Sequence, residues 1–253
     1  MEIRELLEES LGMLSLNKVR TGLAMLGVII GIGSVITLIS LGQASQKSIE
    51  ERIKSLGANL LTISPSRQTT GTVRGASGGG TTLTLADAEA IASSPEVTTI
   101  TAVSPEYASR SQVVAGRNNT NTQIYGVTPE YLTVRSVTIA AGTFFTEQNV
   151  LAQSRVAVIG PTTATDLFGE TDSPIGRSIR IEGQGFTVIG VTQEKGGSGF
   201  QNQDDRVYIP ITTAQKLLYG VDYVSAIAVS TQSEDVMVLA QNQIGYLLLK
   251  TPD

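Results

Sequence analysis

The chain has 253 residues, a formal net charge of −5, and no His, Cys or Trp. Without His or Cys it cannot build a Ser-His-Asp or Cys-His catalytic group, a zinc finger or a thiol redox pair. Its acidic balance argues against a phosphate-binding surface, so nucleic acid is not an expected partner.

The first 20 residues predict an amphipathic helix on the cytoplasmic side of a membrane. Apolar side chains recur there at spacings of three and four, which is typical of a helix lying on a membrane surface or docked on a partner. Lys18 and Arg20 stand immediately before a long apolar run. By the positive-inside rule, these two cations favour a cytoplasmic N-terminus.

Residues 21–42 predict a transmembrane helix. No charged residue occurs between Arg20 and Lys47, and residues 23–41 are strongly apolar. At 1.5 Å per residue this apolar stretch spans about 28 Å, close to the roughly 30 Å hydrocarbon layer of a bilayer. A cleavable signal peptide with its cleavage site at residues 42–44 is the alternative. Signal h-regions usually have about 7–15 residues, so the longer run favours an uncleaved anchor.

One face of this helix carries small residues. Gly27 and Gly31 lie four residues apart, and Ser34 continues the same face. Small residues at this spacing let a second membrane helix approach closely. We therefore expect Gly27, Gly31 and Ser34 to pack against another helix within the membrane.

Residues 43–253 predict an extracytoplasmic domain of the α+β class, because short strands and helices alternate with antiparallel hairpins. Thr84 and Asp87 predict a capping box at the start of a helix. Asn118-Asn119 and Gly183-Gln184 predict two hairpin turns. We expect helices at 45–56, 84–92, 129–135, 162–168, 213–219 and 233–249, and strands at 59–63, 97–103, 112–115, 122–127, 155–159, 177–182, 185–192, 207–211 and 226–230.

The search for a chemical site predicts no catalytic, cofactor-binding or metal-binding residues. Ser198 occupies the serine position of a pattern that starts like a GxSxG elbow. However, Phe200 stands where the final Gly would be, and no His is present to activate the hydroxyl. Asn202, Asp204 and Asp205 lack the Gly and Glu that a calcium loop needs, so a solvated turn is expected. Core or lobe-contact positions are expected for Tyr107, Tyr125, Tyr131, Phe144 and Phe145.

Several segments resemble the MacB-type ABC transporter permeases. Residues 17–36 are similar to the first transmembrane helix of that family, and similar pieces follow in the family's order at 125–131, 142–147, 155–160, 186–191 and 202–205. The resemblance covers nearly the whole chain. It implies a single membrane helix followed by a two-lobed domain, with a porter-like lobe at about 43–128 and 186–253 and a sabre-like lobe at about 129–185.

The resemblance also implies a function. A permease of this family couples the ATP-driven motion of a dimer in the cytoplasm to substrate efflux outside it. The implied partners are an ABC ATPase subunit, a second permease copy, membrane lipid, a periplasmic adaptor and an outer-membrane channel, and the implied location is the bacterial inner membrane. The family pattern continues into three more membrane helices, so we expect this chain to be a truncated permease subunit.

Two other classes of function stay open at this stage. A membrane-anchored sensor or binding domain would have the same anchor and the same external domain without any transport activity. A secreted enzyme is disfavoured because the site search finds no catalytic group. The transported substrate cannot be read from these residues.

Overall fold

The computed structural model describes residues 17–55, 59–65, 83–170, 172–196 and 202–250. These residues divide into two compact units, Met1–Lys54 and Ser55–Asp253. Most of the predicted leader helix, residues 66–82 and Ser198 lie outside the described residues.

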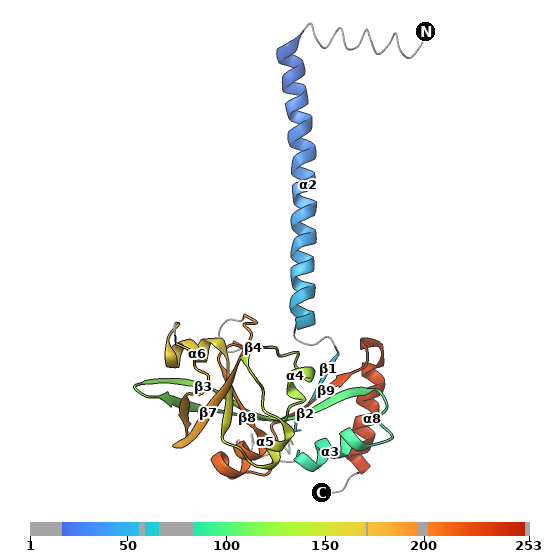
Figure 1. Cartoon of the computed structure of the whole chain (residues 1–253). Helices are drawn as coiled ribbons and strands as arrows, with labels where there is room; N and C mark the ends of the chain where they lie inside the picture. Colours follow the sequence, from blue (N-terminus) through green and yellow to red (C-terminus); the bar gives the residue numbers. More distant parts are fainter. Residues whose placement is uncertain (1–16, 56–58, 66–82, 171, 197–201, 251–253) are drawn as a thin grey trace, which may run out of the picture. The chain divides into compact units, whose positions relative to one another are not determined.

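The first unit is built on one long helix, α2 (Lys18–Ser55), drawn in blue in Figure 1. Its 38 residues correspond to about 57 Å at 1.5 Å per residue. Among the described residues it is the one helix long and apolar enough to cross a membrane, over Lys18–Lys47 with a mean hydropathy of 2.4. The predicted helical continuation beyond Ser45 is confirmed as far as Ser55.

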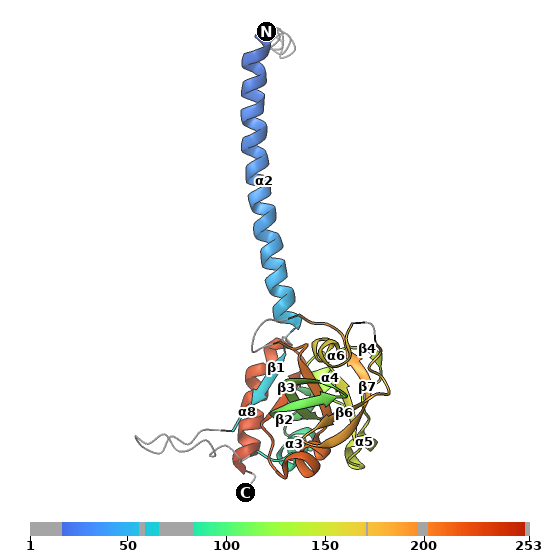
Figure 2. The same cartoon turned by 90° about the vertical axis from the view of Figure 1, so that its left-hand side faces the viewer.

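Part of the second unit is a three-stranded antiparallel sheet covered by helices, which we call the α/β lobe. Its strands lie in the order β1 (Leu60–Ile63), β9 (Ala226–Thr231) and the first half of β2 (Ile100–Ala115). Helix α3 (Leu85–Ser93) contacts both β2 and α8 (Met237–Lys250), which follows the short helix η3 (Glu234–Val236). Helix α8 is the red helix in Figure 2.

The predicted capping box at the start of α3 is confirmed. The Asp87 N–H donates to Thr84 Oγ1 at 3.3 Å, and the Thr84 N–H donates to the Asp87 carboxylate at 2.8 Å. These two bonds satisfy donors that the first turn of a helix leaves without partners.

Residues 107–223 form a closed β-barrel, which we call the barrel lobe. The second half of β2 pairs with β3 (Asn118–Val127), and the ring continues through β8 (Arg206–Pro210), β5 (Val156–Ile159), β7 (Gln184–Thr192) and β6 (Ser178–Ile181). Because β6 also pairs with β2, the six strands close on themselves. Closure removes free strand edges and encloses an apolar interior. The fully buried side chains of these strands include Val113, Ile124, Ile159, Ile181, Val188 and Val207.

The remaining elements cover or extend the barrel. Strand β4 (Ile139–Gly142) pairs with β7, and α6 (Pro161–Phe168) contacts β3, β7 and β8. The other helices are α4 (Tyr131–Val134), α5 (Glu147–Leu151), α7 (Ile211–Thr213) and the π-helix η2 (Ala214–Tyr219). The predicted α+β class is therefore confirmed, whereas β4 was not predicted.

Strand β2 corrects two sequence-based predictions. The strand expected at 112–115 and residues 100–103 of the strand expected at 97–103 are parts of this one 16-residue strand, which begins at Ile100. Its first half pairs with β9 and its second half with β3, so β2 belongs to both lobes. The hairpin turn also lies earlier than predicted, at Gly116-Arg117, because Gly116 adopts a φ of +60° that glycine accepts without strain.

The strand pairing indicates a boundary between the two lobes. Strands β3, β7 and β8 belong to the same ring as β5 and β6. This pairing separates the lobes after Glu106 and before Val224, whereas the sequence placed boundaries near 128 and 186. The division into porter-like and sabre-like lobes stays a prediction.

Candidate functional site

The predicted helix-packing residues lie on one face of α2. A Cβ added at Gly27 or Gly31 would meet no atom within 4 Å. The Ser34 hydroxyl donates to the Gly31 carbonyl at 2.9 Å, so it is bonded within its own helix. This face therefore has room for a neighbouring helix, and Lys18 and Arg20 lie exposed at the start of the same helix.

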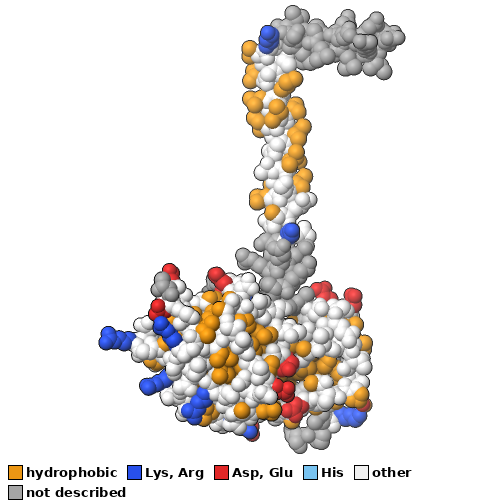
Figure 3. Space-filling view, viewed as in Figure 1, with side chains coloured by type: hydrophobic (Ala, Val, Ile, Leu, Met, Phe, Trp, Pro, Cys, Tyr) orange, Lys and Arg blue, Asp and Glu red, His pale blue; other side chains and the backbone are white. Residues whose placement is uncertain are grey.

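The large apolar side chains of α2 are exposed along its whole apolar stretch. From Val19 to Leu41 they are between 52% and 78% exposed. Figure 3 shows hydrophobic side chains all along this helix. A helix that is apolar on every face is typical of a lipid-embedded segment.

The junction between the two lobes contains a buried ion pair that the sequence did not reveal. Arg135, directly after α4, donates to both oxygens of Glu106 on β2, at 2.7 and 2.9 Å. The Glu106 side chain is 5% exposed and the Arg135 side chain 26%. Burial lowers the pKa of Arg135, but the hydrogen bond and attraction to Glu106 outweigh it and raise that pKa above the ordinary value. The bidentate geometry makes this a strong, directional contact.

Two further cations lie near this pair. Lys195 Nζ donates to the Arg135 carbonyl at 2.9 Å, and the Arg206 guanidinium lies 4.8 Å from the centre of the Tyr125 ring. Burial, together with repulsion from Arg206, lowers the pKa of Lys195. The junction is thus held by charged groups as well as by apolar packing.

Aromatic side chains pack next to these charges, on the outer face of the barrel wall, because Tyr125 and Tyr208 alternate with the inward-facing Ile124 and Val207. Tyr131 contacts Tyr208 and Tyr125, and Phe144 stacks on Phe145 with ring centres 4.1 Å apart. All five aromatic residues singled out from the sequence belong to the core or pack against it, as predicted. Burial raises the pKa of both Tyr131 and Tyr208.

The acidic stretch near residue 204 is not the solvated turn that the sequence suggested. Asp204 is 5% exposed. Its carboxylate accepts hydrogen bonds from the backbone N–H groups of Lys195 and Gly196, both at 2.9 Å, while Asn202 Oδ1 accepts from the Asp204 N–H. Asp205 accepts from the Thr163 hydroxyl. In the described parts of the chain, no three His, Cys, Asp or Glu side chains are grouped to hold a metal ion.

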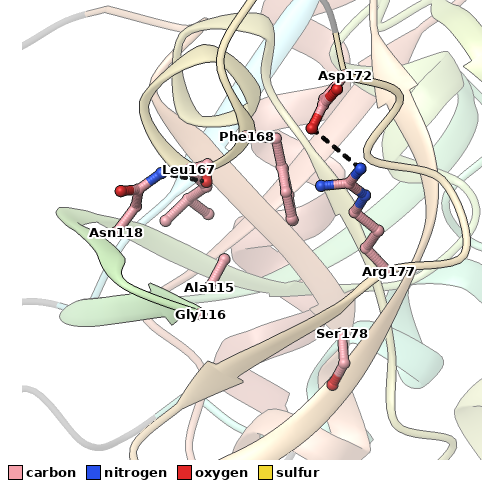
Figure 4. Close-up of a pocket in the computed structure, with 8 residues that line it drawn as sticks. All are labelled: Ala115, Gly116, Asn118, Leu167, Phe168, Asp172, Arg177 and Ser178. Carbon is pink, nitrogen blue, oxygen red and sulfur yellow. Dashed lines mark hydrogen bonds and ion pairs between the residues drawn. The ribbon is translucent and has the colours of Figure 1, made fainter.

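An open recess of about 320 Å³ lies between the β2–β3 turn, α6 and the start of β6. Figure 4 shows the Arg177 side chain paired with Asp172, beside Phe168. This pair is about half exposed, with side-chain exposures of 48% and 53%. The side-chain amide Nδ2 of Asn118 donates a hydrogen bond to the Leu167 carbonyl at 2.9 Å. The lining offers a cation, a carboxylate and an aromatic ring, but no nucleophile paired with a base.

Relatives of known type match nearly the whole chain. The family model described as the MacB-like periplasmic core domain matches residues 21–246. The macrolide export ATP-binding/permease protein MacB of Bdellovibrio bacteriovorus is 38% identical over 249 residues, which are 98% of this chain and 38% of that protein. The protein of the same name from Chlorobaculum tepidum is 36% identical over 234 residues, 92% of this chain and 36% of that protein. The chain thus spans well under half the length of these relatives.

Two solved structures share the fold. The periplasmic region of MacB from Actinobacillus actinomycetemcomitans superposes with a TM-score of 0.65 at 23% identity, covering 79% of this chain and 87% of that one. The extracellular domain of the transporter YknZ from Gram-positive bacteria gives a TM-score of 0.61 at 22% identity, covering 75% and 92%. With the family model matched over most of the sequence, the chain belongs to the MacB-like periplasmic core domain family.

Proposed function

We propose that this chain supplies the first membrane helix and the periplasmic core of an ABC-type export permease. The observation that carries this proposal is the combination of an apolar helix whose membrane window is unburied and a core domain of the MacB-like family. The MacB relatives are named as macrolide exporters, which makes macrolides the substrate class to test first.

In this proposal the chain works with several partners. An ABC ATPase subunit in the cytoplasm binds ATP and brings two permease copies together. Helix α2 is unbroken from Lys18 to Ser55 and resists bending, so it relays movement across the membrane better than a flexible linker would. Gly27, Gly31 and Ser34 provide its packing face. A periplasmic adaptor and an outer-membrane channel receive the substrate.

The proposed location is the bacterial inner membrane, with the N-terminus in the cytoplasm and residues 43–253 outside. Lys18 and Arg20 support this orientation. A signal peptidase cut after Ala44 would fall inside the continuous helix α2, which favours a retained anchor. The α/β lobe would then be the porter-like lobe, and the barrel lobe the sabre-like one.

The test is to measure macrolide accumulation in an efflux-deficient Gram-negative host. The chain is expressed there with the ABC ATPase and permease segments encoded nearest to it. We expect accumulation to fall, and to recover when the ATPase carries a substitution that abolishes ATP hydrolysis. An ATPase that neither co-purifies with the chain nor changes accumulation would contradict the proposal and favour a membrane-anchored sensor or binding domain.

A matched pair of variants tests the packing face of α2 in the same assay. Gly27→Ile with Gly31→Ile fills the predicted contact face, whereas Gly33→Ile adds the same side chain on another face. None of these glycines has an atom of this chain near its added Cβ. A loss of efflux in the double variant alone would therefore arise from a neighbouring helix. An equal loss of efflux in the double variant and in the Gly33→Ile variant would contradict the assignment of Gly27 and Gly31 to a packing face.

A further inference from the structure

Two passages of chain connect the lobes, and they run side by side. One is β2 at Glu106–Tyr107, and the other is the segment at 223–226 that leads into β9. The Ser225 N–H donates to the Glu106 carbonyl at 2.8 Å, and the Ala108 N–H donates to the Ser225 hydroxyl at 3.0 Å. Paired connections of this kind can absorb a change in backbone angle, as in hinged two-domain proteins.

The position of Glu106 on this connection is specific. Glu106 is the last residue of β2 that pairs with β9, opposite Ala226, and Tyr107 is the first that pairs with β3, opposite Gly126. Glu106 therefore lies where β2 passes from the α/β lobe into the barrel lobe.

The partner of Glu106 comes from the barrel lobe. Arg135 follows α4, which contacts both β2 and β9 and whose Tyr131 and Val134 are buried. Lys195, on the segment after β7, donates to the carbonyl of the same arginine at 2.9 Å. A second barrel segment thus holds the backbone of the arginine that pairs with Glu106.

We propose that the Glu106–Arg135 ion pair locks this hinge, so that the α/β lobe and the barrel lobe move as one rigid body. Backbone bonds keep the two passages adjacent, and apolar side chains of both lobes share one core, but apolar packing is not directional and leaves the angle between the lobes to a directional contact. A buried bidentate contact from the barrel lobe fixes it, because any rotation that separates Arg135 from Glu106 leaves a buried carboxylate without its partner. The consequence for export rests on the proposed function: a domain with a locked hinge would transmit movement of α2 without losing it to bending between the lobes.

The experiment measures the distance between the lobes directly. The chain contains no Cys, so the pair Ala92→Cys and Thr165→Cys places one spin label on α3 and one on α6, both at exposed positions. Pulsed electron spin resonance on the full chain in detergent gives the distribution of distances. The pair Gln148→Cys and Thr165→Cys, within the barrel lobe, is the control for label mobility.

We expect one narrow distribution for the unsubstituted hinge. Arg135→Met should widen the distribution of distances between the lobes by about twofold or more, whereas the distribution of distances within the barrel lobe should stay narrow. Arg177→Met removes an exposed ion pair inside the barrel lobe and should change neither distance.

A second variant separates unlocking from unfolding. Glu106→Leu combined with Arg135→Met removes both charges of the pair together, so neither is left buried alone, and the fold is kept while the directional contact is lost. A broad inter-lobe distance in this double variant supports the lock, and a narrow one overturns it. Macrolide efflux is measured separately, so an absent transport activity would contradict the proposed function while leaving the distance result standing.

Discussion

Apolar side chains have opposite surroundings in α2 and in the domain that follows it. Ile30 of α2 is 60% exposed, whereas Ile209 of β8 is fully buried. Burial of apolar surface contributes roughly 25 cal/mol per Å², and the domain obtains this stabilisation from its own core. Helix α2 buries none of its apolar window within the chain. The difference indicates that the domain is stabilised by its own core, whereas the apolar window of α2 gains no stabilisation from burial within the described chain.

The largest effect is expected from charged residues placed in α2, because they test whether this helix spans a membrane. Ile29→Lys together with Ile36→Lys should release the chain from the membrane, because two lysines near the helix centre cost about 5–7 kcal/mol on insertion. The measurement is the fraction of chain that stays with membranes after a carbonate wash. Ile29→Leu with Ile36→Leu is the matched control and should behave like the parent. A charged variant that stays as firmly bound would contradict a membrane-spanning α2.

The same truncation in the two regions should have very different effects on stability. Ile209→Ala should lower the free energy of unfolding of the domain by about 2–5 kcal/mol, because it removes buried methyl groups and leaves a cavity. Ile30→Ala should leave that free energy unchanged. Urea unfolding of the full chain in detergent, followed by tyrosine fluorescence, gives both values. Equal losses would mean that α2 packs against the domain.

Glycines in the two regions should also respond differently to an added methyl group. A Cβ at Gly160 would overlap the Asp204 carbonyl oxygen, so the backbone must shift. We expect Gly160→Ala to cost about 1–3 kcal/mol of stability. At Gly31 nothing lies within 4 Å, and Gly31→Ala should be neutral for the domain. An unchanged midpoint for Gly160→Ala would show that the β5–α6 turn adapts freely.

The smallest predicted effect appears at high pH. Burial, with repulsion from Tyr223 and Tyr219, raises the pKa of Tyr107 from 10.0 to about 12. The native state therefore holds its proton more tightly than the unfolded chain. The stabilisation of the native state by this pKa difference is complete below pH 10 and is lost as the pH rises toward 12. Unfolding midpoints across this range should fall less steeply for Tyr107→Phe than for the parent chain, and identical slopes would contradict the assignment.

Local patterns in the sequence predicted the elements that depend on local physics. The Thr84–Asp87 capping box and the β6–β7 hairpin involve residues close in sequence, and the structure has both, although the hairpin turn is Glu182-Gly183, one residue earlier than predicted. The uncharged run after Arg20 predicted α2 because length and hydropathy alone determine whether a helix suits a membrane.

Features that depend on distant pairing could not be predicted in the same way. Ser104-Pro105-Glu106 reads as a break, yet β2 passes straight through it. Pro105 lies in the half of β2 that pairs with β9 alone, so one side of the strand has no ladder there, as is typical of proline in strands. Barrel closure by β2 and β6 is a contact between segments about 70 residues apart, which no local pattern encodes.

The Glu106–Arg135 pair and the burial of Asp204 were missed for the same reason. Glu106 and Arg135 are 29 residues apart in sequence, and each reads as an ordinary surface charge until the fold brings them together. The one available signal was Glu106 itself, a charge flanked directly by Pro105 and Tyr107.

The most direct measurement of the central claim is labelling of single cysteines in intact cells. The chain has no Cys, so Ser15→Cys and Ser66→Cys each provide one thiol, on either side of α2. With a membrane-impermeant maleimide applied from the periplasm, only the Ser66→Cys variant should react, and the Ser15→Cys variant should react only after the inner membrane is opened. Reaction of both thiols before opening, or recovery of the domain as a soluble product cut near Ala44, would contradict a retained membrane-spanning helix.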